Sequence, residues 1–69
     1  MLVKFDHRKM RMCLYDHEMT QVKLSELSGV SRPSINKAIK GRPCKEETGR
    51  KICEALGVDI HEYATFNRF

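Results

Sequence analysis

Residues 20–41 constrain the fold of this chain more than any other stretch, because every boundary in it has the chemistry of a helix end. Thr20 and Ser31 can each cap the start of a helix by accepting a hydrogen bond from a backbone N–H of the first turn. Gly29 and Gly41 can adopt the left-handed conformation that ends a helix. The stretch therefore predicts two short helices joined by a tight turn, over about residues 21–28 and 32–40.

Apolar residues in this stretch would hold the two helices together. We expect them to be Leu24, Leu27, Val30, Ile35 and Ala38. The second helix also carries Arg32, Asn36, Lys37 and Lys40, whose polar side chains do not belong in a core. A short helix with a buried apolar side and a basic outer face has the dimensions and chemistry to enter the major groove of DNA.

Three further helices are predicted around this pair. Asp6 can cap a helix over about residues 7–17, with Met10, Leu14 and either Cys13 or His17 on its inward side. A helix over about residues 45–56 has Glu46 and Glu47 in its first turn, where the helix dipole favours acids. Its expected core residues are Ile52, Cys53 and Leu56. After it, Val58 is expected to point inward, and Asp59 is expected to cap a last short helix over Ile60–Ala64.

The two ends of the chain are harder to assign. Residues 1–5 alternate in a way that suits a strand, but the run is too short to predict one. The aromatic tail, residues 65–69, is expected to fold back beside residues 2–5; a dimer contact and a frayed end are the alternatives. The predicted fold class is all-α: residues 1–69 form one domain, a compact bundle of four to five short helices.

Composition limits the possible functions. A chain of 69 residues allows one modest core, and no apolar run approaches the ~20 residues that span a bilayer. The first residues lack the apolar centre of a signal peptide, so we expect a cytoplasmic location and no membrane partner. Three cysteines with no CxxC pair indicate reduced thiols. Cys13 and His17 have metal-ligand spacing, but two ligands do not make a site, so neither a metal nor a cofactor is expected.

The charges are unevenly distributed. The net charge is +4, and between residues 32 and 45 there are five basic residues and no acid. A second basic group comprises Lys4, Arg8, Lys9 and Arg11, whereas acids gather in residues 16–26 and 54–62. We therefore expect one positive and one negative face, which suits a polyanionic partner; an ordinary solvated surface is the alternative.

Several motifs together resemble a known family. Met19-Thr20-Gln21, Gly29-Val30-Ser31-Arg32, Ile35, Gly41 and the later Ile52–Val58 stretch are similar to the Cro/repressor-type (XRE-like) helix-turn-helix domain. That family comprises lambda-repressor-like, five-helix DNA-binding domains of phage repressors and small bacterial regulators. The resemblance covers about residues 7–64.

The resemblance implies two groups of DNA contacts. Base contacts would come from Arg32, Pro33, Ser34, Asn36 and Lys37. Phosphate contacts would come from Thr20, Gln21, Lys40, Arg42 and Lys45, the last three in the loop after the second helix. The chemistry agrees, since a helix N-terminus attracts anions, Arg or Lys can pair with guanine, and Asn can pair with adenine.

The sequence also departs from the family pattern. Leu14 and Ile39 stand where many members have a buried arginine–glutamate pair, and Ser25 replaces a small alanine. Gly49 replaces a common core leucine, which costs about 1 kcal/mol of helix propensity and leaves an apolar hole. We expect Phe5 or Phe66 to fill that hole.

The resemblance implies a transcriptional regulator that binds double-stranded DNA sequence-specifically. We expect a repressor that occupies an operator as a homodimer. The alternative is a protein-interaction module, such as a modulator or an antitoxin-like partner of another regulator or a toxin. An enzyme is not expected, because His7, His17 and His61 are far apart in sequence and no nucleophile or phosphate-loop motif accompanies them.

Overall fold

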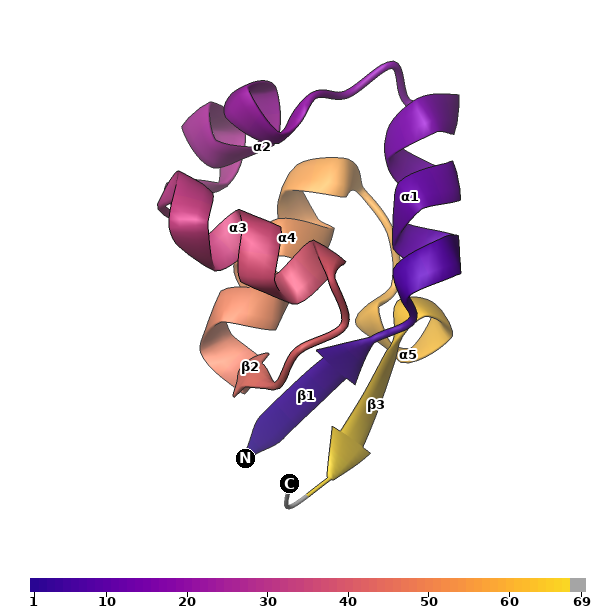
Figure 1. Ribbon diagram of the computed structural model, residues 1–69, viewed down its shortest axis with the longest axis vertical. Helices are drawn as coiled ribbons and strands as arrows, with labels where there is room; N and C mark the ends of the chain where they lie inside the picture. Colours follow the sequence, from indigo (N-terminus) through magenta and orange to yellow (C-terminus); the bar gives the residue numbers. More distant parts are fainter. Residues whose placement is uncertain (68–69) are drawn as a thin grey trace.

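Five helices and three short strands make up the computed structural model, which describes residues 1–67 (Figure 1). In chain order they are β1 (Leu2–Phe5), α1 (His7–Asp16), α2 (Gln21–Ser28), α3 (Arg32–Ile39), β2 (Cys44–Lys45), α4 (Glu46–Leu56), α5 (Ile60–Tyr63) and β3 (Ala64–Asn67). Arg68 and Phe69, the end of the tail expected to fold back, lie outside the described residues.

The predicted helices are confirmed to within one residue at each end. Asp6 caps α1 by accepting a hydrogen bond from the Lys9 N–H at 3.0 Å, and Thr20 caps α2 by accepting one from the Lys23 N–H at 3.0 Å. Ser31 is at the start of α3, but its predicted cap bond is wrong. Its hydroxyl donates instead to the Ser34 hydroxyl at 3.0 Å.

A three-stranded antiparallel sheet corrects the all-α prediction. β1 lies in the middle, with β2 on one side and β3 on the other. Val3 faces Cys44 in one pair and Phe66 in the other, so the tail folds back beside residues 2–5 as expected. A four-residue strand is too short to be evident from its own alternation, and here it is stabilised by partners at both edges. Val3 and Phe5 point into the core.

One apolar core joins the helices to the inner face of this sheet. Its buried residues are Val3, Phe5, Met10, Cys13, Leu14, Leu24, Val30, Ile35, Ala38, Ile39, Cys44, Ile52, Cys53, Leu56 and Ile60. Between the two alternatives on α1, Cys13 is buried and His17 is exposed. The prediction for Leu27 is wrong: its side chain is 54% exposed, because α2 buries only Leu24.

All three cysteines are buried free thiols. Burial raises the pKa of each, and it raises the pKa of Cys53 to about 12. These thiols therefore pack as small apolar groups and stay protonated at neutral pH.

The space beside Gly49 is filled by the sheet. A Cβ added to Gly49 would lie 2.9 Å from the Val3 Cγ2, 3.3 Å from the Ile60 Cδ1 and 3.4 Å from the Phe5 Cζ. Phe5 thus has the expected role together with Val3, whereas Phe66 stacks on the His61 ring at 4.9 Å between centroids. The Arg50 guanidinium is 5.7 Å from the centre of the Phe66 ring.

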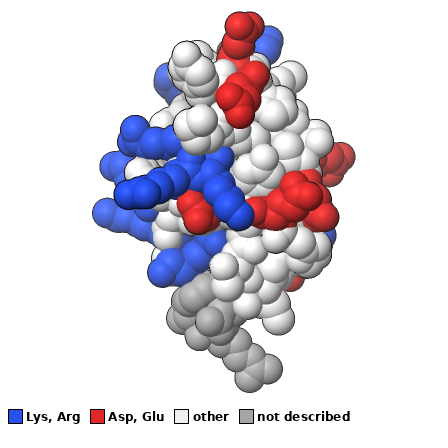
Figure 2. All heavy atoms as spheres, turned by 90° about the vertical axis from the view of Figure 1, so that its right-hand side faces the viewer, with Lys and Arg blue, Asp and Glu red and all other residues white. Residues whose placement is uncertain are grey.

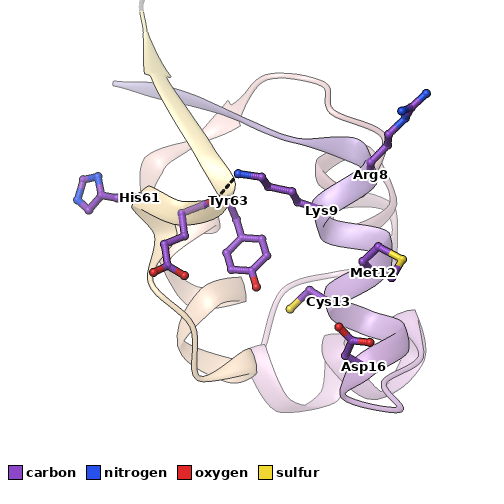
Figure 3. Close-up of a pocket in the computed structure, with 8 residues that line it drawn as sticks. Arg8, Lys9, Met12, Cys13, Asp16, His61 and Tyr63 are labelled. Atoms are coloured by element: carbon purple, nitrogen blue, oxygen red, sulfur yellow. Dashed lines mark hydrogen bonds between the residues drawn. The ribbon is translucent and has the colours of Figure 1, made fainter.

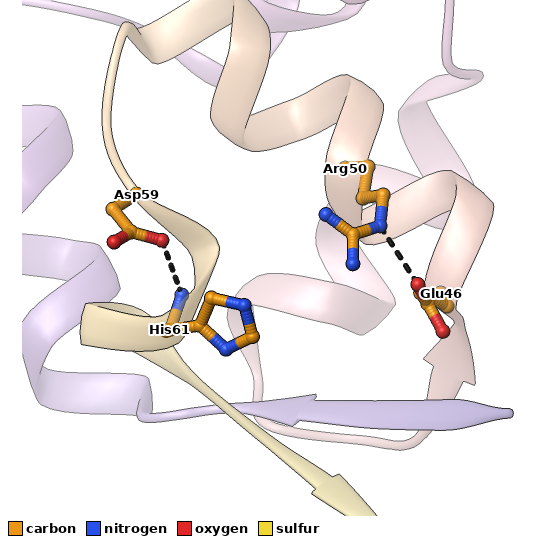
Figure 4. A network of polar contacts seen from close by, with 4 residues as sticks. All are labelled: Glu46, Arg50, Asp59 and His61. Carbon is orange, nitrogen blue, oxygen red and sulfur yellow. Dashed lines mark hydrogen bonds and ion pairs between the residues drawn. The ribbon is translucent and has the colours of Figure 1, made fainter.

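Polar contacts stabilise the outside of this region (Figure 4). The Arg50 Nε donates to the Glu46 Oε2 at 2.7 Å, one helical turn apart on α4. Asp59 caps the short α5 by accepting a hydrogen bond from the His61 N–H at 3.0 Å. Across residues 1–67, no helix is both long and apolar enough to cross a bilayer.

Candidate nucleic-acid interface

α3 has two chemically different sides. Ile35, Ala38 and Ile39 are buried almost completely, so they form the side that packs on the core. The predicted base-contacting residues lie on the remaining surface: Arg32, Pro33 and Lys37 are exposed, and Ser34 and Asn36 are half-buried. The structure therefore presents the polar side of α3 outward and prevents it from rolling, because rolling would expose three apolar side chains.

The turn before α3 is held by two serines of α2. The Ser25 hydroxyl donates to the Val30 carbonyl oxygen at 2.6 Å, and the Val30 N–H donates to the Ser28 hydroxyl oxygen at 3.2 Å. Gly29 between them is left-handed, with φ 74°. Ser25, which departs from the usual alanine, therefore both fits the helix contact and fixes the turn.

The end of α3 is fixed as firmly as its start. Gly41 has φ 82°, and its N–H donates to the Ala38 carbonyl oxygen at 3.0 Å. The Arg42 N–H donates to the Lys37 carbonyl oxygen at 3.2 Å, which completes a Schellman motif. The His7 Nδ1 lies 3.0 Å from the Ile39 carbonyl oxygen, so α1 also contacts this end.

A direct hydrogen bond joins the start of α2 to the outer side of α3. The Asn36 Nδ2 donates to the Gln21 Oε1 at 3.3 Å, and both side chains are half-buried. An amide group has two N–H donors and one oxygen acceptor. The bond therefore leaves the Asn36 oxygen and its second N–H able to meet a base, and leaves the Gln21 amide nitrogen able to donate to an anion.

The predicted phosphate-contacting residues lie in three places. Thr20 and Gln21 are at the N-terminus of α2, where the helix dipole is positive, although the Thr20 hydroxyl is already used as the cap. Lys40 and Arg42 are exposed directly after α3. Lys45 was expected in the same loop, but it is the second residue of β2, where it pairs with Leu2, and its side chain is exposed.

Two residues that were not predicted as DNA contacts border this surface. Arg11 and Tyr15 of α1 line a groove of about 500 Å³ together with Gln21 and Ile39. Tyr15 is 80% exposed. Arg11 and Tyr15 are four residues apart on a helix whose inward positions are Met10, Cys13 and Leu14, so this spacing was the available signal.

Charges are also segregated on the side of the molecule that carries α1, α5 and β3. Figure 2 shows Lys and Arg gathered along one border of that face, with Asp and Glu toward the opposite border and at one end. The two groups meet near the middle of the face, and uncharged surface lies above and below that point. This face is therefore of mixed sign.

Metal chemistry finds little support in the geometry. The Cys13 Sγ lies 3.7 Å from the His17 Nδ1, the pair noted for its spacing. The same nitrogen lies 2.7 Å from the Cys13 carbonyl oxygen, which is the hydrogen bond the ring makes within its own helix. Among residues 1–67, no group of three or more potential ligands is arranged to hold a metal ion.

Comparison with known proteins gives one match. A family model described as helix-turn-helix matches residues 8–63. No curated protein and no solved structure is significantly similar to the chain. The match spans α1 to α5, whereas β1 and β3 lie outside it.

Proposed function

The chain belongs to the Cro/repressor-type (XRE) helix-turn-helix family of DNA-binding regulators, and we propose that it recognises one double-stranded operator and represses transcription by occupying it. The observation that carries the proposal is the outward polar side of α3 over a fully buried Ile35, Ala38 and Ile39. Occupancy requires only binding, so this mechanism needs no activity beyond that surface.

The base contacts follow from the exposed side of α3. Arg32 and Lys37 have the donors that guanine O6 and N7 accept, and Pro33 offers only an apolar contact, which suits a thymine methyl group. Ser34, whose hydroxyl oxygen already accepts from Ser31, lies between them as a shorter polar contact. Three or four such side chains are the usual reading set of one recognition helix.

Asn36 would read adenine through a pre-oriented amide. Its bond to the Gln21 Oε1 keeps its nitrogen on one side, so its oxygen and second N–H present acceptor and donor in one order. Adenine offers the complementary donor and acceptor at N6 and N7. Gln21 would meanwhile donate to a phosphate from the N-terminus of α2, which links backbone binding to base reading.

The remaining contacts would fix the register on the duplex. Thr20, Lys40, Arg42 and Lys45 are proposed phosphate contacts, and Arg11 and Tyr15 extend that set from the groove beside Gln21. We further propose a homodimer on a roughly palindromic operator, with half-sites about one helical turn, ~34 Å, apart.

Selection from a random double-stranded DNA library tests the proposal. The purified protein should enrich one motif, and its affinity for that motif should exceed its affinity for a scrambled sequence at least ~10³-fold. Both affinities should fall steeply with salt. Lys51→Ala, which removes an exposed cation of α4, is the matched control and should bind like the original protein. No enriched motif, with equal affinity for every sequence, would contradict operator recognition and favour the protein-interaction module.

A further inference from the structure

The charges of α1 are arranged against its helix dipole. Its first turn carries Arg8 and Lys9 and no acid, while Asp16 ends the last turn, which carries no base. A helix N-terminus favours acids and a C-terminus favours bases, so each of these charges is at the end that disfavours it. α4 shows the favourable arrangement, with Glu46 and Glu47 in its first turn. The dipole of α1 therefore does not account for the positions of Arg8 and Asp16, although the N-cap Asp6 supplies an acid beside the first turn.

A groove runs along the same charges. It has a volume of about 580 Å³, lies between α1 and α5, and is lined by Met12, Cys13 and Tyr63 in its middle part. Figure 3 shows Arg8 and Lys9 toward one end of the groove and Asp16 at the other, with Met12 and Cys13 between them. His61 and Glu62 of α5 complete the lining.

The two ends of the groove differ in how their charges are used. The Lys9 Nζ donates to the Glu62 carbonyl oxygen at 3.3 Å, so Lys9 holds α5 against α1. Arg8 and Asp16, by contrast, form no ion pair within the part of the chain that the structure describes. Both side chains are exposed.

Arg8, Met12 and Asp16 form a stripe along one side of α1, since they are spaced four residues apart. Met12 in its centre is 59% exposed, so it offers apolar surface to a partner. The cation and the carboxylate are eight residues apart, about 12 Å along the helix axis, on either side of Met12.

We propose that this stripe binds the same stripe of a second copy of the chain, with the two α1 helices antiparallel about a two-fold axis at Met12. In that arrangement Arg8 of each copy faces Asp16 of the other, and the two Met12 side chains meet at the axis. A partner must offer an acid opposite Arg8 and a base opposite Asp16 at the same spacing, and a second copy meets both requirements. The proposal gives the homodimer a surface, but it does not rest on DNA binding.

The proposed contact is small. A standard interface buries about 800 Å² per partner, and one pair of crossing helices buries less. We therefore expect a dissociation constant in the range of tens of micromolar, on the order of 10⁻⁵ M. Sedimentation equilibrium without DNA measures it directly.

Charge reversal provides the decisive variants. Arg8→Glu and Asp16→Arg each convert both ion pairs into like-charge contacts, so each should weaken association about tenfold or more. The double variant R8E/D16R restores opposite charges across the axis and should restore association. Asp16→Arg improves the match between α1 and its dipole, whereas Arg8→Glu also places a second acid beside the N-cap Asp6. Circular dichroism should therefore show both variants folded, with melting temperatures close to that of the original protein.

Lys51→Glu on α4 is the matched control for Arg8→Glu, because it makes the same change of net charge away from the stripe and should leave association unchanged. Three results would overturn the proposal: an original protein that stays monomeric at millimolar concentration, single reversals that associate normally, or a double variant that stays as weak as the single ones. Retained DNA selection with lost association would leave operator recognition intact and contradict only the proposed homodimer, since the two measurements are independent.

Discussion

The helix-turn-helix and the sheet region use their side chains in opposite ways. α3 turns Arg32, Pro33 and Lys37 to solvent, where they have few neighbours to support. The sheet region places Val3 2.9 Å from where a Gly49 side chain would begin. Removing a side chain from the exposed side of α3 should therefore weaken DNA binding and change stability little. Adding a side chain at Gly49, beside the sheet, should lower stability without altering the binding surface.

The largest expected effect comes from overfilling the sheet region. Gly49→Leu should lower the free energy of unfolding by about 3 kcal/mol or more, because its Cβ alone already clashes with Val3 and crowds Ile60 and Phe5. Chemical denaturation measures the loss. Gly49→Ala alone should also lose stability. Adding Val3→Ala to it should recover most of that loss, since it removes the nearest clashing methyl group. A fully stable Gly49→Leu protein would break the comparison.

The opposite effect is expected on α3. Lys37→Ala should cost about 1–3 kcal/mol of operator binding and relax the base preference, while the free energy of unfolding changes by less than about 0.5 kcal/mol. Fluorescence anisotropy with operator and scrambled DNA separates the two effects. An equal loss on both DNAs would remove Lys37 from the base-reading set.

Lys40 provides the matched cation, three residues further along the chain and just beyond α3. Lys40→Ala should weaken binding to all sequences alike and reduce the slope of log affinity against log salt by about 1. If Lys40→Ala changed the base preference and Lys37→Ala did not, the proposed roles of the two lysines would be reversed.

Alkaline pH should act on the buried thiols of the core and sheet. Burial holds the Cys53 pKa at about 12 against an ordinary value of 9.0, and it raises the pKa of Cys13 and Cys44 as well. A raised pKa stabilises the folded state fully below pH 9, and this contribution is lost as the pH rises from 9 toward 12.

Unfolding in urea at pH 8 and at about pH 10.5 measures the effect. Cys53 should account for a loss of about 1–2 kcal/mol over that interval. Cys53→Ala should show a correspondingly smaller loss, since other alkaline titrations are common to both proteins. An identical loss in the variant would show that the Cys53 thiol is not protected by burial.

The smallest expected change lies in neither region. Glu18, between α1 and α2, has φ 51°, and the next N–H, that of Met19, donates to the Leu14 carbonyl oxygen at 2.8 Å. The backbone there needs the conformation that glycine adopts without strain, so Glu18→Gly should raise the free energy of unfolding by about 0.5–1 kcal/mol. Thermal denaturation checks this, and Glu18→Ala is the control that should show no gain.

The helices were predictable because short-range chemistry fixes their ends. The Asp6 and Thr20 side chains and the Gly29 and Gly41 N–H groups each bond to a group within four residues, so a local stretch of sequence contains each helix end. The burial of Leu27 was wrongly predicted, because an apolar side chain on a short helix does not show by itself whether it faces the core. In the structure, α2 buries only Leu24.

The sheet and part of the candidate site depend on contacts that a local pattern does not contain. β1 finds its partners about 40 and 60 residues further along the chain, and only those partners make its four residues a strand. The Asn36–Gln21 bond spans 15 residues, so each residue was assigned a role but not the link between them. The sequence predicted the space beside Gly49. The residue that mainly fills it, Val3, could not be predicted without knowledge of the sheet.

The central place of β1 has a consequence for how the chain folds. Contacts between α2 and α3 close short loops, but the β1–β3 ladder joins Leu2 to Asn67 and closes nearly the whole chain. Closing a long loop costs more entropy and slows a folding step. We therefore expect the helical hairpin to be an early nucleus and the β1–β3 ladder a late, rate-limiting closure.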